Sequence, residues 1–164
     1  MKIGFSTTNS PVSKVIKFFT RSKVSHAYIV FDVAGEQLII HSTQKGVNCD
    51  YYPTFAKNHT IVAEYEITAD PEKEKLALAE SIKLLDQPYD FLSIVGFVWV
   101  LTLRAIGIKA RAPFKNRSAY YCSELGLMIL RKLDMDCPGM ERELTSPEDL
   151  LECLEGKSEV KRVI

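Results

Sequence analysis

The sequence Ser-His-Ala-Tyr-Ile-Val-Phe-Asp-Val-Ala-Gly-Glu-Gln-Leu-Ile-Ile-His-Ser-Thr, residues 25–43, decides the fold class. Two runs rich in β-branched and aromatic residues flank Ala34-Gly35, a pair typical of a tight turn. We therefore expect an antiparallel hairpin with a two-residue turn, in which Val33 faces Glu36 across the ladder.

This register decides where the two histidines of the hairpin point. His41 lies opposite Tyr28, and residues two apart on one strand share a face, so His26 and His41 are diagonal neighbours on one face. Their backbones are then roughly 7–8 Å apart, close enough for the imidazoles to hydrogen-bond. A four-residue loop would keep this arrangement, whereas a three-residue loop would place the rings on opposite faces.

The second informative stretch is Tyr-Tyr-Cys-Ser-Glu-Leu-Gly-Leu-Met-Ile-Leu, residues 120–130, which predicts a loop that turns into an apolar helix. A thiol at a helix start faces free backbone N–H groups and the positive end of the helix dipole, and both favour the thiolate. Cys122 is therefore the predicted nucleophile. An inert core cysteine is the alternative, because cysteine is among the most buried residue types.

Together these residues predict a nucleophilic triad. His26 has the small neighbours Ser25 and Ala27, which leave access, so we assign it as the base. His41 is the group that orients it. The backbone N–H of Cys122 is one oxyanion donor. Tyr120 or Tyr121 is the expected second donor. Tyr89 either lines the substrate groove or belongs, with Asp90, to a helix-start cap.

A zinc site is the main rival use of His26, His41 and Cys122, because these ligand types suit zinc. The chain contains neither H-E-x-x-H nor C-x-x-C spacing, so we expect no metal and no cofactor. His59, which opens the next predicted strand, is interpreted as an ordinary strand residue.

The remaining pattern predicts one α+β domain over residues 1–164, with the sheet-forming segments mostly first and the helices afterwards. Residues 46–58 are expected to be irregular, and Leu76, Ala79, Ile82 and Leu85 to mark the buried face of their helix. Strands are expected at 2–6, 59–67 and 159–164, and helices at 11–20, 71–85, 119–133 and 147–155.

Composition narrows the class of protein. Hydrophobic residues make up 46% of the 164 residues, and Lys+Arg and Asp+Glu are both 21, so no overall field attracts nucleic acid. None of the four cysteines lies in a C-x-x-C pair, and the N-terminus has no apolar signal region. We therefore expect reduced thiols and a cytoplasmic location.

One apolar run, residues 91–103, ends at Arg104 and is too short for a membrane span of about 20 residues. A buried helix is one interpretation, and an apolar flap facing a membrane or substrate is the other. A basic loop follows, which is either solvated surface or a contact to an acidic substrate or lipid phosphate. It contains Lys109, Arg111, Lys115 and Arg117.

Four segments carry a resemblance to a known family. Ser25–Val30 resembles the histidine strand of the circularly permuted NlpC-type papain-like hydrolases, the YiiX-like group, and Tyr121–Leu125 resembles their nucleophile motif. Gln87–Phe91 and Ser146–Leu150 resemble two weaker motifs of the same group. The resemblance implies a permuted papain-like fold, an antiparallel sheet packed against helices, and peptidase or amidase chemistry through a thioester.

The family also includes relatives of lecithin-retinol acyltransferase, in which the third residue is a second histidine, matching His41. In YiiX-like members it is often a carboxylate, which is absent at that strand position here. Three functions follow: a hydrolase of peptides or peptidoglycan fragments, a lipid acyltransferase or phospholipase with peripheral membrane contact, or a non-catalytic binding module.

Overall fold

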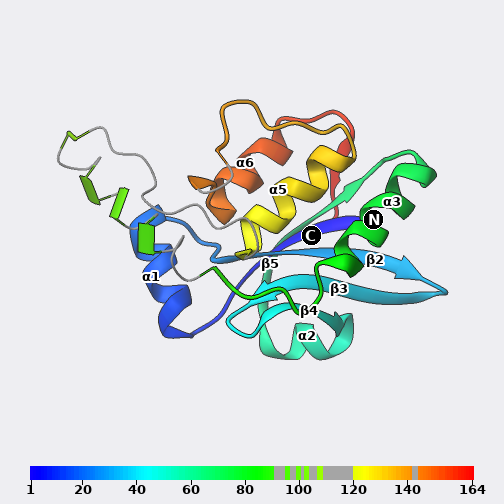
Figure 1. Cartoon of the computed structure of the whole chain (residues 1–164), viewed down its shortest axis with the longest axis horizontal. Coiled ribbons are helices and arrows are strands. Elements are labelled where there is room, and N and C mark those ends of the chain that lie inside the picture. Colours follow the sequence, from blue (N-terminus) through cyan, green and yellow to red (C-terminus); the bar gives the residue numbers. More distant parts are fainter. Residues whose placement is uncertain (91–94, 97–98, 101, 104–106, 109–119, 142–143) are drawn as a thin grey trace.

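The fold was determined as a computed structural model, which describes residues 1–90, 95–96, 99–100, 102–103, 107–108, 120–141 and 144–164 (Figure 1). In chain order, the elements are β1 (Lys2–Thr7), α1 (Pro11–Thr20), β2 (His26–Val33), β3 (Glu36–Thr43), β4 (Gly46–Tyr51), α2 (Tyr52–Asn58), β5 (Thr60–Ile67), α3 (Pro71–Lys83), α5 (Cys122–Lys132), α6 (Pro147–Glu155) and β6 (Val160–Arg162).

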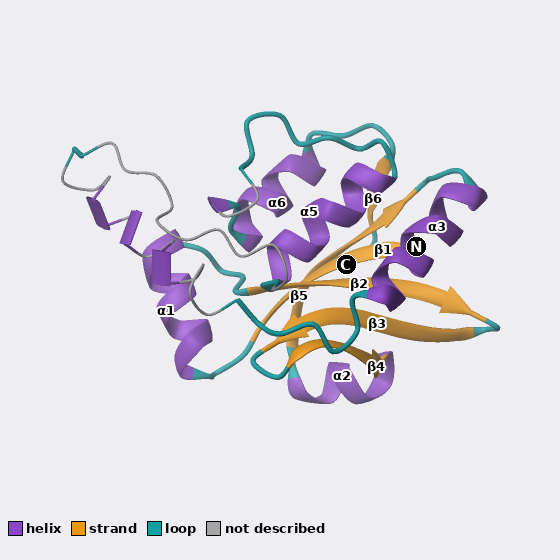
Figure 2. Ribbon diagram, viewed as in Figure 1, coloured by secondary structure: helices purple, strands orange, loops and turns teal. Residues whose placement is uncertain are grey.

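The strands form one antiparallel sheet in the order β4-β3-β2-β1-β5-β6. Helices α3, α5 and α6 cover one face, and α2 packs against the other (Figure 2). The chain is thus α+β, with an antiparallel sheet packed against helices, as the sequence predicts.

The hairpin has the predicted register, with Val33 paired to Glu36 and Ile29 to Ile40. Side chains of β2 therefore alternate between the two faces of the sheet. Ala27 and Ile29 belong to the larger core, which α5 completes, whereas Tyr28 packs with Phe55 of α2 on the opposite face.

The prediction that residues 46–58 are irregular is wrong, because this segment forms β4 and α2. The segment lacks a clear strand-like alternation of apolar residues because β4 is an edge strand whose second half is exposed. Gly46 begins the strand at φ 110°, and a Cβ there would lie 2.5 Å from the carbonyl oxygen of Gln87. This close contact requires glycine.

The predicted face of α3 is also wrong, because Leu76 and Ile82 are exposed while Ala77 and Ser81 are fully buried. Small side chains let α3 approach α5 closely, and the Ser81 hydroxyl donates to the Ala77 carbonyl at 2.7 Å. The buried face of α3 is thus the one whose small side chains allow a close approach to α5, and not the most hydrophobic one.

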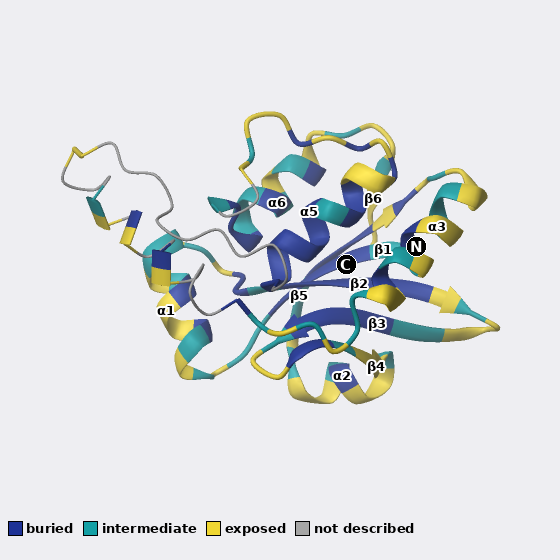
Figure 3. Ribbon diagram, viewed as in Figure 1, coloured by how far each residue is buried: buried dark blue, intermediate teal, exposed yellow. Residues whose placement is uncertain are grey.

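Helix α5 is the central helix, and eight of its 11 residues are buried (Figure 3). It begins at Cys122, where the backbone N–H of Tyr121 donates to the Glu124 carboxylate at 3.0 Å. Gly126 faces α6, and a Cβ there would lie 2.7 Å from a methyl group of Leu150. These contacts fix the helix start against the sheet.

Cys137 and Cys153 form a disulfide with their Cα atoms 5.9 Å apart, so the expectation that all thiols are reduced is wrong. Only Cys49 and Cys122 are free among the cysteines. The bond ties the segment after α5 to α6. The spacing of 16 residues matches no short cysteine motif. The disulfide removes one of the two arguments for a cytoplasmic location, which stays a prediction.

Most of the apolar run 91–103, and all of the basic loop 109–117, lie outside the described residues. Within the run, Val95 and Trp99 are exposed and Val100 is fully buried. In the described part of the chain, we found no helix long and apolar enough to cross a membrane.

Candidate active site

The two hairpin histidines lie on one face of the sheet, as their register predicts, and contact each other. The Nε2 atom of His26 and the Nδ1 atom of His41 are 2.9 Å apart. On its other side, the Nε2 atom of His41 is 2.9 Å from Oδ2 of Asp50, a half-exposed residue of β4. The three residues form a continuous hydrogen-bonded chain.

The Asp50 carboxylate determines which nitrogens carry protons. A carboxylate only accepts, so the Nε2 atom of His41 must donate to it, and the Nδ1 atom of the neutral ring becomes an acceptor. His26 then donates from Nε2 and keeps the lone pair on Nδ1. This arrangement is that of an oriented base, and Asp50 is the carboxylate that sequence reasoning missed.

Sequence reasoning missed Asp50 because residues 46–58 were not expected to form a strand. In the structure, Asp50 pairs with Ile39 on β3, two residues before His41, which places its side chain on the histidine face. The alternation of polar and apolar side chains at Asn48-Cys49-Asp50, directly after the hairpin, is the pattern that could have predicted this strand.

Burial keeps the histidine rings neutral. It holds the pKa of His26 well below its usual value of 6.5, with further lowering by His41 and His59. The pKa of His41 is also lowered by burial, although the Asp50 carboxylate partly opposes this. Both rings are therefore unprotonated at neutral pH, as a base requires.

His59 belongs to this cluster, contrary to its interpretation as an ordinary strand residue. It caps the end of α2, stacks on Phe55 at 3.8 Å between ring centroids, and lies 5.7 Å from the ring of His26. Its Nδ1 atom lies 3.2 Å from the Phe55 carbonyl oxygen. Burial lowers its pKa as well.

The rings open onto a pocket of about 550 Å³. One wall is the start of α1, with Val12, Ser13 and Ile16, and Tyr89 closes another side. The remaining lining is rich in hydroxyl and other polar groups: Thr8, Ser10, Ser25, Ser42, Thr43, Gln44, Lys45, Asn48 and Asp50.

Cys122 is the first residue of α5 and is buried. Burial raises its pKa to about 11, although the backbone N–H groups of Ala27, Ser123 and Cys122 itself lower it. The predicted contact with helix-start amides is present, but the prediction of a ready thiolate is wrong. Desolvation outweighs the amides, so the resting thiol is protonated at neutral pH.

The sulfur of Cys122 lies at the backbone N–H of Ala27, one residue along β2 from His26. His26 faces Phe55 of α2, whereas α5 packs on the side of Ala27. Within the described residues, no hydrogen bond joins the sulfur of Cys122 to His26 or His41. The structure brings the two histidines together but does not place the thiol in contact with them.

Tyr89 is the predicted site residue that lies near both groups. Its side chain lines the histidine pocket. Its pKa is raised mainly by burial and, to a lesser extent, by the nearby Cys122 and Glu124. The other two tyrosines lie where α5 begins.

Tyr121 donates its hydroxyl to the Thr145 carbonyl at 3.2 Å, and an oxyanion role for this hydroxyl stays a prediction. The Tyr120 carbonyl accepts from the Ser42 hydroxyl at 2.5 Å, which ties the start of α5 to β3. An oxyanion role for the Tyr120 hydroxyl stays a prediction.

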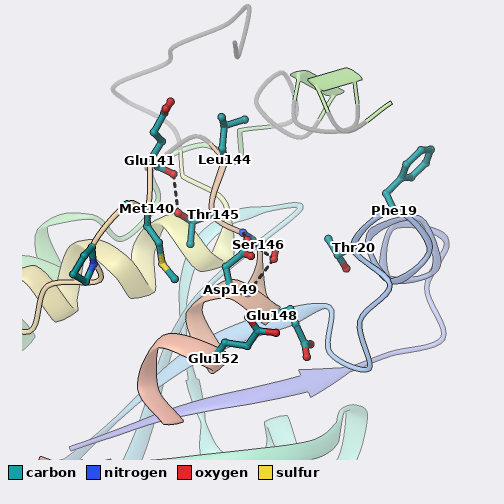
Figure 4. A pocket seen from close by; sticks show the side chains of 12 residues that line it. Phe19, Thr20, Met140, Glu141, Leu144, Thr145, Ser146, Glu148, Asp149 and Glu152 are labelled. Carbon is teal, nitrogen blue, oxygen red and sulfur yellow. Dashed lines mark hydrogen bonds between the residues drawn. The ribbon is translucent and has the colours of Figure 1, made fainter. Parts of the chain in front are cut away.

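A second pocket, of about 440 Å³, lies where the end of α1 meets the start of α6 (Figure 4). Asp149 in this pocket accepts from the Ser146 backbone N–H at 2.7 Å and caps α6. Its described lining contains four carboxylates but no histidine and no free cysteine, so it offers neither a thiol nor an imidazole base. The carboxylates are Glu141, Glu148, Asp149 and Glu152.

A comparison with solved structures found a neighbour, the crystal structure of metalloprotein yiiX from Escherichia coli O157:H7, DUF1105. The TM-score is 0.69 over 99% of this chain and 94% of the other, at 14% identity. The chain shares the fold of YiiX. At this identity, the likeness to YiiX shows the fold alone. No family model and no curated protein matches the sequence.

Proposed function

We propose that this protein is a permuted papain-like cysteine hydrolase that cleaves an amide or ester through a thioester on Cys122. The observation that carries the proposal is the chain from Asp50 through His41 to His26. It leaves an oriented lone pair on a neutral ring beside a substrate-sized pocket. Peptides or peptidoglycan fragments are the proposed substrates.

In this mechanism, the Nδ1 atom of His26 takes the proton of Cys122 as the sulfur attacks the substrate carbonyl. A base is needed because the pKa of the thiol is about 11. The protonated ring then gives its proton to the leaving amine or alcohol, and a thioester remains. Water, deprotonated by the same ring, releases the acid and restores the thiol.

The proposal requires that the ring of His26 and the sulfur meet when a substrate enters. Both flank Ala27: His26 precedes it in β2, and the Ala27 N–H faces the sulfur. A rotation of either side chain at this end of β2 is the movement required. The N–H of Cys122 is the proposed oxyanion donor.

YiiX is named as a metalloprotein, which raises the question of whether the histidines of this chain could hold a metal. The Nε2 atom of His26 and the Nδ1 atom of His41 are hydrogen-bonded to each other, and the Nε2 atom of His41 is hydrogen-bonded to Asp50. In the parts of the chain described here, no group of three or more His, Cys, Asp or Glu side chains is arranged to hold a metal. The residues do not fit a metal centre.

Acyl transfer from a lipid, or phospholipid hydrolysis, is a second candidate, favoured by the exposed apolar side chains of α1. A non-catalytic binding module is the third, favoured by the buried, protonated state of Cys122. In the module, Cys122→Ser would leave function unchanged.

The test is hydrolysis of a panel of peptide amides, peptidoglycan fragments and lipid esters. We expect Cys122→Ser to abolish turnover and His26→Gln to lower kcat about 100- to 10,000-fold. Asp50→Asn should lower kcat by a smaller factor, whereas the matched control Asp32→Asn, on the exposed end of β2, should not. Turnover that survives Cys122→Ser would refute the thioester.

A further inference from the structure

Helix α1 exposes a large aromatic side chain that no part of the described protein covers. Phe18 is 77% exposed and Val15 is 43% exposed, whereas Ser13 and Ile16 on the same helix are buried. Phe18 is the most exposed of the large apolar side chains in the described residues. Phe18 and Val15 therefore leave an apolar strip of an ordered helix open to solvent.

The same segment carries a concentrated positive charge. Residues 11–23 contain Lys14, Lys17, Arg21 and Lys23 and no acidic residue, although the whole chain is balanced at 21 cations and 21 anions. Lys17 and Arg21 also complement the negative end of the helix dipole. Phe18 carries no charge, so interaction with the helix dipole does not account for its exposure.

These side chains occupy one face of α1. At 100° per residue, Lys14 and Phe18 project in similar directions, with Lys17 on one flank and Val15 on the other, and Arg21 follows as the left-handed C-cap. Carboxylates near the end of α1 line the acidic pocket on the side of Phe19 and Thr20 (Figure 4). One of them, Glu148, accepts from the Ser22 hydroxyl beyond the end of α1, away from Lys14, Val15 and Phe18.

We propose that α1 docks on an anionic lipid bilayer, with Phe18 and Val15 entering the headgroup region and the cations contacting lipid phosphates. An apolar residue flanked by lysine and arginine on one face of a short helix matches such a surface in both polarity and charge. The opposite face of α1, with Val12, Ser13 and Ile16, walls the histidine pocket. Docking therefore holds the pocket at the membrane.

The experiment is flotation of the full chain with vesicles of phosphatidylcholine alone or with 30% phosphatidylserine. We expect binding only to the anionic vesicles, weakening as salt rises. Phe18→Glu should lower the apparent affinity about tenfold or more, and Lys14→Gln about fivefold. Leu76→Glu, on the exposed face of α3, is the matched control and should change nothing.

Circular dichroism checks that each variant is folded. Equal binding of the wild type to neutral vesicles, or an unchanged affinity in folded Phe18→Glu, would overturn the proposal. Self-association through Phe18, detected by light scattering without flotation, would overturn it in favour of a second copy of the chain. Vesicle binding is measured without turnover, so this proposal and the proposed catalysis fail separately.

Discussion

Acidification from pH 7.5 to 5.5 is expected to destabilise this protein through its buried histidines. The folded-state pKa values of His26, His41 and His59 all lie below 6.5, the value for an unfolded histidine. Below pH 6.5 the unfolded chain binds more protons than the folded chain, so stability falls as pH falls. Above pH 6.5 this effect is absent.

The magnitude follows from linkage. Since the pKa of His26 is held well below 6.5, its ring alone should cost about 1.4 kcal/mol of unfolding free energy at pH 5.5. His41 and His59 add smaller amounts. For a chain of 164 residues, this corresponds to a fall of roughly 3–6 °C in Tm.

The assay is urea unfolding at half-unit pH steps between 7.5 and 5.5, a window that lies above the usual titration range of carboxylates. The matched variant His26→Gln cannot take up a proton, so its stability should depend less on pH by about 1.4 kcal/mol over this range. A wild-type stability that is flat or rises on acidification would refute the account of the cluster.

Two further predictions concern the frame around the site. The ring of Tyr28 lies over Gly4, and its hydroxyl donates to buried Glu64 at 2.7 Å. A Cβ at position 4 would lie 2.1 Å from that ring. Gly4→Ala should therefore lower the free energy of unfolding by at least about 2 kcal/mol, measured by urea unfolding. An unchanged midpoint would contradict that packing. Replacing the Cys137–Cys153 pair by serines should cost about 3 kcal/mol, since the bond closes a loop of about 16 residues. Alkylation of the unfolded chain should label only Cys49 and Cys122 before reduction, and Cys137 and Cys153 as well after reduction, which reports the disulfide itself.

Most of the strands and helices could be predicted from patterns within short stretches of the sequence. The Ala34-Gly35 turn fixed the hairpin register, and therefore the shared face of His26 and His41, because side-chain direction in a ladder depends only on parity. Ser10-Pro11 likewise marks the start of α1, where the Ser10 hydroxyl accepts from the Ser13 N–H at 3.1 Å.

The missed features depend on long-range packing. Asp50 joins His41 only because an edge strand with a weak apolar pattern pairs with β3. The protonated state of Cys122 reflects desolvation by its surroundings, which a helix-start rule does not count. The disulfide joins a cysteine in the loop after α5 to one in α6, and their spacing follows no motif.

The central claim, a thioester on Cys122 formed with His26 as base, is tested most directly by trapping the acyl-enzyme. Exposed Cys49 would also react, so the measurement uses a Cys49→Ser background. The protein is exposed to an activated peptide ester and quenched in acid, and its intact mass and peptide map are recorded. The account predicts one acyl group, located on Cys122 and formed far more slowly in His26→Gln. No adduct on Cys122, or one that forms equally fast in His26→Gln, would contradict it.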